Sequence, residues 1–149
     1  MPFERELIEA KLALNLITSD DMPKIAWDAL EAGLDGPGIR RLAALERPTF
    51  FEVRDVLPRA SEEMGLSQLT TREAALRLAK QRALEILESG DDPLLHTKDF
   101  QHLWVQAGYP REIASVGNLY DDVYIAEASN QSEERIRGWV TARLKDLIR

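Results

Sequence analysis

The spacing of the apolar residues is the feature that most constrains the fold of this chain. Apolar side chains recur three and four positions apart throughout, and no stretch keeps the strict alternation of a half-buried strand for long. A three-and-four spacing gives a helix one apolar face, which then packs against other helices. Trp27, Trp104 and Trp139 fall at core positions of this pattern, and we expect three packing anchors. The sequence therefore predicts an all-α protein.

Capping and helix-breaking residues divide this pattern into segments. Thr70 and Glu73 match a capping box, and Gly90 is suited to end the same helix. A helix is expected to start near Thr49, with apolar residues inward at Phe50, Val53, Val56 and Leu57. Pro58 is expected to kink or split this helix. The other predicted helices cover approximately residues 2–17, 20–33, 39–45, 97–107, 111–118, 119–128 and 132–148. The segment 119–128 either continues the preceding helix or follows it.

The length of the chain fits one domain. A chain of 149 residues can bury roughly 70% of the surface that its unfolded form exposes. We expect a single helical domain over residues 1–149, with about seven or eight helices packed as α-hairpins. Two hairpins with Ala-Gly at Gly33 and Gly108 share a similar pattern. HEAT-like layers are one arrangement of such hairpins, and two unrelated hairpins are the other.

Composition and the first residues indicate a compartment. The sequence has no cysteine, which excludes disulfides, zinc–thiolate sites and thiol catalysis. Glu4, Glu6 and Glu9 occupy the region where a signal peptide needs a basic start and an apolar block. No uncharged apolar run is long enough to span a bilayer. We therefore expect a cytoplasmic protein with no membrane association.

The charge distribution indicates the kind of partner. The net charge is −7, and residues 1–36 alone carry −5. Binding to duplex nucleic acid usually needs a basic face, whereas the basic residues between Arg72 and Arg82 are interleaved with acids such as Glu73 and Glu85. Nucleic acid is therefore not the expected partner. A negative surface favours basic protein partners and speeds their association.

The stretch "NLYDDVYIA" at residues 118–126 contains the one pair of adjacent aspartates that does not precede a helix start. If it is helical, Leu119, Val123 and Ala126 share one buried stripe. Asp121 and Asp122 then lie on the solvent side of a packed helix. This is the first of two interpretations of the pair.

The second interpretation is a divalent-cation site. Asp121 or Asp122 would act with Glu127 or Glu112, because carboxylate oxygens are the ligands that hard cations prefer. Several of these oxygens would have to converge on one point, at about 2.0–2.6 Å from the ion.

The two histidines offer a weaker signal. His96 and His102 are six positions apart, which does not match the spacing of a helical metal-binding pair. Asp99 and His102 are three apart, so His102 is either an oriented base or part of a surface pair. The sequence offers no nucleophile within a recognised motif to act with it.

The segment "MPKIAWDALEAGLDGPGIRRLAAL" resembles a part of small, uncharacterised bacterial all-helical proteins. These open with an apolar helix and continue with an Ala-Leu-x-x-Gly-x-Asp-x-Pro-x-x-Arg-x-Leu-Ala hairpin. Here Gly33, Asp35 and Pro37 match, and Arg40 or Arg41 takes the arginine position. The resemblance covers about the first third of the chain. It implies an all-helical fold and brings no activity with it.

These features favour a binding protein over an enzyme. The sequence contains no G-x-S-x-G elbow, P-loop, Rossmann glycine pattern or EF-hand loop. We expect a cytoplasmic, non-catalytic protein-binding module without a cofactor, for example an immunity protein that masks a basic toxin of the same bacterium. One alternative is a small metal-dependent or acid/base enzyme that uses Asp121, Asp122 and His102. Another is a self-assembling structural protein.

Overall fold

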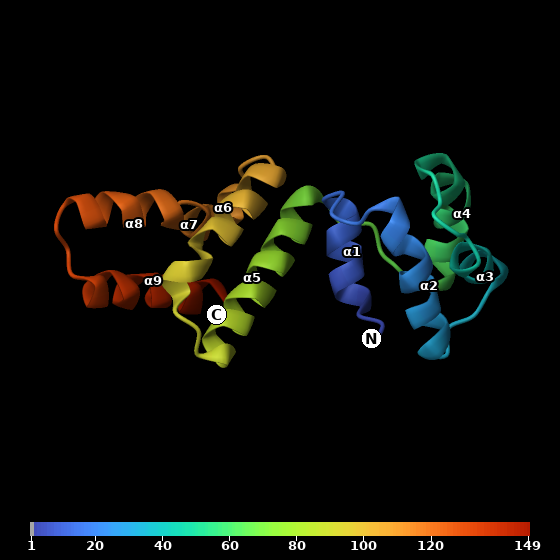
Figure 1. Ribbon diagram of the computed structural model, residues 1–149, viewed down its shortest axis with the longest axis horizontal. Coiled ribbons are helices and arrows are strands. Elements are labelled where there is room, and N and C mark those ends of the chain that lie inside the picture. Colours follow the sequence, from blue (N-terminus) through green and yellow to red (C-terminus); the bar gives the residue numbers. More distant parts are fainter. Residues whose placement is uncertain (1) are drawn as a thin grey trace. The chain divides into compact units, whose positions relative to one another are not determined.

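The computed structural model describes residues 2–149, and every regular element in this range is helical (Figure 1). The predicted all-α class is therefore confirmed. Among residues 2–149, no helix combines the length and the apolarity that crossing a bilayer requires. The chain divides into two compact units, residues 1–69 and residues 70–149. That residues 1–149 form one domain stays a prediction.

Unit 1 (residues 1–69) has a core built by three helices. Its elements are α1 (Arg5–Ala13), the 3₁₀ turn η1 (Ser19–Asp21), α2 (Met22–Glu31), α3 (Pro37–Ala43) and α4 (Phe50–Glu63). The short helix α3 packs against both α2 and α4. The buried residues of this core are Met22, Ala26, Ala29, Ile39, Leu42, Ala43, Val53, Val56, Ala60 and Met64.

A side chain of α4 binds the N-terminus of α3. The Glu63 carboxylate accepts hydrogen bonds from the backbone N–H groups of Ile39, at 2.9 Å, and Gly38, at 3.3 Å. Burial opposes the charged form of Glu63. The bonds from Ile39 and Gly38, with one from Arg59, outweigh it and hold the pKa of Glu63 below its ordinary value. A Cβ on Gly38 would lie 2.8 Å from the backbone nitrogen of Ala60, so the glycine permits this close approach.

Unit 2 (residues 70–149) is also entirely helical. Its elements are α5 (Thr71–Ser89), η2 (Pro93–His96), α6 (Thr97–Gln106), η3 (Arg111–Ile113), α7 (Ala114–Gly117), α8 (Leu119–Ala128) and α9 (Glu133–Leu147). Helix α9 packs against α5, α7 and α8, and α6 packs against α7 and α8. Figure 1 shows α8 and α9 running side by side. The helix α7 is a single turn. Without it, residues 2–149 contain eight α-helices, which agrees with the seven or eight expected. A HEAT-like arrangement stays a prediction.

The predicted helix ends agree with the structure at several points. Thr70 and Glu73 form the capping box of α5, and Thr49 forms a second one on α4. Gly90 ends α5 in the left-handed conformation, with φ of 76°. The expected split at Pro58 is wrong, because α4 continues through it to Glu63. Pro58 is exposed, so water can reach the carbonyl group that loses its donor there.

Two expectations about helix length and packing are wrong. Helix α1 ends at Ala13 instead of continuing to residue 17, because Asn15 adopts a left-handed conformation with φ of 56°. Trp27 is 55% exposed and is no core anchor. Trp104 and Trp139 are half-buried, and the Trp104 indole donates to the Pro110 carbonyl at 3.0 Å.

Candidate functional site

Helix α8 has the packing that the sequence predicts. Its apolar stripe is buried; the members are Leu119, Val123 and Ala126. Asp121 is exposed. Asp122 accepts a hydrogen bond from Arg143 Nη1 at 2.6 Å, and both side chains are partly exposed. Asp122 therefore joins α8 to α9, a long-range role that the local pattern did not reveal.

The structure does not bring the proposed cation ligands together. Among residues 2–149, no three His, Asp or Glu side chains are placed to hold one metal ion. Glu127 is exposed at the end of α8, and Glu112 Oε1 lies 4.0 Å from Arg72 Nη1. Asp122 Oδ2 already accepts the hydrogen bond from Arg143.

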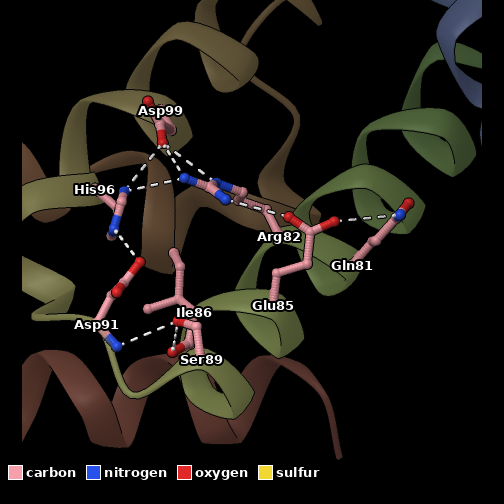
Figure 2. Close-up of polar contacts among 8 residues, drawn as sticks. All are labelled: Gln81, Arg82, Glu85, Ile86, Ser89, Asp91, His96 and Asp99. Atoms are coloured by element: carbon pink, nitrogen blue, oxygen red, sulfur yellow. Dashed lines mark hydrogen bonds and ion pairs between the residues drawn. The ribbon is translucent and has the colours of Figure 1, made fainter.

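The first histidine, rather than the second, lies in a polar cluster of unit 2 (Figure 2). Arg82 of α5 donates to Asp99 Oδ2 of α6 at 2.9 Å and to Glu85 Oε2 at 3.1 Å. Its Nη2 also lies 3.0 Å from His96 Nδ1. His102, the sequence candidate, is exposed. Asp99 thus contacts Arg82 rather than orienting His102.

The geometry around His96 favours a structural role. A guanidinium group can only donate hydrogen bonds, so His96 Nδ1 is the acceptor opposite Arg82. The other ring nitrogen, Nε2, lies 3.5 Å from Asp91 Oδ2. Both ring nitrogens therefore face charged partners, and the cluster connects α5, η2 and α6.

A hollow of 360 Å³ lies along α8 and α9. Its lining includes Ile125, Trp139 and Arg143. The Arg143 guanidinium lies 4.7 Å from the centre of the Trp139 ring and is already paired with Asp122. Arg143 is therefore engaged within the unit.

A larger hollow lies on unit 1, and we call it the α4 groove. It has a volume of 720 Å³. One side is a stripe of α4 at positions 50, 53, 54, 57, 58, 61 and 62. The other residues come from α1, the connection to η1, the start of α2 and the segment after α4; they are Glu9, Leu12, Ala13, Asn15, Ile17–Ser19, Met22 and Leu66–Leu69.

The α4 stripe has the spacing of a helix face that packs against another helix. Its positions follow one another at three and four residues over the length of α4. Phe50, Val53 and Leu57 give this face apolar character, and Leu12 of α1 faces the same groove. Phe50 remains 64% exposed. Val53 is buried and Leu57 is half-buried, so Phe50 is the exposed apolar member of this face. An exposed apolar side chain beside an apolar groove is a feature of protein-binding surfaces.

Adjacent aromatic residues mark one end of the groove. Phe50 and Phe51 are both 64% exposed, and their rings meet edge to face at 5.7 Å. The Arg54 guanidinium lies 5.1 Å from the centre of the Phe51 ring and 5.9 Å from that of Phe50. Phe50 lines the groove, whereas Phe51 is absent from its lining. The two phenylalanines are thus equally exposed, but only Phe50 lines the groove.

Negative charge predominates on unit 1. Residues 1–69 hold eight basic and thirteen acidic side chains, a net charge of −5. Glu9 is buried, and its Oε2 accepts the backbone N–H of Ser67 at 2.6 Å, which fixes the segment that follows α4. Glu62 is exposed and lines the groove. Arg54, the one basic residue of the lining, contacts the two phenylalanines.

The sequence reasoning did not identify the α4 groove. The apolar spacing predicts Phe50, Val53, Val56 and Leu57 on the inner face of one helix. Val53 and Val56 are buried as predicted, whereas Phe50 is exposed. The available signal was the Phe50-Phe51 pair, because neighbouring residues of a helix differ by about 100° and cannot both face a narrow core.

No family model, no curated protein and no solved structure matches the chain. The resemblance of its first third to small bacterial helical proteins stays a hypothesis.

Proposed function

We propose that this chain is a non-catalytic protein-binding module and that the α4 groove is its binding site. The observation that carries the proposal is the α4 groove, where buried Val53 and half-buried Leu57 line a hollow of 720 Å³ and Phe50 stays largely exposed at its end. Burying such a face against a partner releases water from apolar surface, which is the main favourable term in protein association.

The charge of unit 1 favours a basic partner. With a net charge of −5, this unit attracts cationic surfaces and accelerates their encounter at low ionic strength. An immunity-type role, in which the chain covers a basic toxin, is one concrete form of this function. Titration of purified basic toxins against the protein, with a growth-rescue assay, tests that form; absence of both binding and rescue would remove it.

Site-specific photo-crosslinking tests the general proposal. A photoreactive phenylalanine analogue is introduced at Phe50 or at Leu95, which is 77% exposed and lies on unit 2. We expect a defined protein adduct from position 50 and none from position 95. The adduct partner is then purified, and Phe50→Ser should weaken its binding more than Phe51→Ser does. Equal crosslinking from both positions, or no adduct at all, would contradict the proposal.

Self-association is the second candidate, because exposed rings beside an apolar groove can be self-complementary. In a twofold dimer, Phe50 and Phe51 of each copy would contact the groove of the other. The repulsion between two units of charge −5 opposes this arrangement. Light scattering distinguishes the candidates: a monomer mass favours a foreign partner, and a dimer that Phe50→Ser dissociates favours self-association.

A further inference from the structure

We infer that the occupant of the α4 groove is an amphipathic helix of about three turns whose polar face is basic. This inference rests on the proposed function, and it adds the secondary structure, length and charge of the segment that binds. It follows from the helical form of the groove wall, the chemistry of the lining and the distribution of charge around it.

The length of the occupant follows from the lining of α4. The stripe extends from Phe50 to Glu62, twelve residues apart, along one continuous helix. At about 1.5 Å per residue, this is a wall of about 18 Å. A helix of about twelve residues has the same length, so three turns can pack along the wall with the usual interaxial distance of about 8–10 Å.

The apolar lining favours a helix over an extended segment. An extended peptide needs hydrogen-bond partners for its backbone, and residues 2–149 contain no strand whose edge could supply them. Against side chains such as Val53, Leu57 and Leu12, unpaired amide groups would carry a desolvation cost. A helix satisfies its own backbone and presents only side chains to this surface. Its contacts with α4 would come from apolar residues at positions i, i+3 or i+4, and i+7.

The surrounding charge makes the polar face of the occupant basic. Glu62 lies at the C-terminal end of the α4 stripe, and exposed Asp20 follows Ser19 of the groove lining. Arg54 lies toward the other end, over the two phenylalanine rings. Lysine or arginine residues of the occupant therefore gain most at the end that lies over Glu62. At the Phe50 end, an apolar or aromatic side chain fits better.

A designed peptide tests the inference directly. The probe is a fluorescein-labelled peptide of eighteen residues that carries leucine at helical spacing and lysine elsewhere. One control peptide replaces every lysine with glutamate, and another keeps the composition but places two prolines at its centre to break the helix. Fluorescence anisotropy at low salt, with the full chain as titrant, measures binding. We expect the leucine–lysine peptide to bind and the two control peptides not to bind. Added salt should weaken the binding.

Matched variants locate the binding. We expect Phe50→Ser to weaken binding about tenfold or more, because a buried aromatic contact is lost, whereas the equally exposed Phe51→Ser changes it about twofold or less. Glu62→Lys should also weaken binding by introducing repulsion. Asp55→Lys, an exposed charge reversal on α4 outside the groove lining, is its control. Far-ultraviolet circular dichroism of each variant verifies that its helix content is unchanged.

The outcomes separate this inference from the proposed function. Binding of the proline peptide or the glutamate peptide with the same dependence on Phe50 overturns the helical or basic character of the occupant and leaves the groove as a binding site. A photo-crosslinked partner that depends on Phe50, together with no binding by any peptide, also overturns only the inference. If neither peptide nor partner depends on Phe50, the proposed function fails as well. Phe50-dependent binding of a small apolar dye, without peptide binding, shows a small-molecule site instead and overturns both.

Discussion

Gly38→Ala is expected to destabilise the contact between α3 and α4 that supports the α4 groove. An added Cβ would lie 2.8 Å from the backbone nitrogen of Ala60 and 3.0 Å from Glu63 Oε1. The backbone of α4 cannot move without shifting its core residues, and overpacking of this kind costs about 1–3 kcal/mol. Alanine gains at most about 1 kcal/mol over glycine inside a helix. The free energy of unfolding should therefore fall, by about 3 kcal/mol at most.

Gly138→Ala is the matched control for this substitution. Gly138 lies within α9, and a Cβ there would meet no atom within 4 Å. Only the higher helix propensity of alanine over glycine remains, so we expect the free energy of unfolding to rise by about 0.5–1 kcal/mol. Urea titration followed by circular dichroism measures both variants. If Gly38→Ala stabilised the protein as Gly138→Ala does, the close packing of α3 on α4 would be refuted.

Three further predictions concern unit 2. Gly117→Ala should lower the free energy of unfolding by about 1–3 kcal/mol, because a Cβ there would collide with the ring of Trp104; a shift in indole fluorescence would report the displaced ring. Hydrogen bonds from Arg137, opposed by burial, hold the pKa of Asp92 below its ordinary value. The stability lost in Asp92→Asn should thus be complete at neutral pH and shrink as the pH falls below about 4, and a constant difference down to acid pH would contradict this. Millimolar Mg²⁺, Mn²⁺ or Ca²⁺ should leave the melting temperature unchanged, whereas a site at a hundred times its dissociation constant would add about 2.7 kcal/mol.

Local signals in the sequence predicted the helical architecture well. The capping box of Thr70 and Glu73 and the left-handed Gly90 act through neighbours in the chain, so their effect is visible without a structure. The buried stripe of α8 follows in the same way from apolar spacing. Its outer residue Asp121 is exposed, as the same spacing predicts.

Features that depend on distant residues could not be predicted in this way. The bond from Arg143 to Asp122 and the cap that Glu63 provides for α3 join residues more than twenty positions apart. The α4 groove also depends on which face of α4 the core covers, and a wide apolar face leaves that choice open. Phe50 counted as a core residue in the spacing, yet it is exposed because Val53 and Val56 face the core instead.

Amide chemical shifts of the ¹⁵N-labelled full chain, recorded during titration with the leucine–lysine peptide, test the central claim most directly. We expect saturable changes along α1 and α4, at residues of the groove such as Leu12, Leu57 and Ser67, and we expect Phe50→Ser to abolish them. Changes centred instead on Ile125 and Trp139 of α8 and α9 would contradict it, as would changes that Phe50→Ser leaves intact.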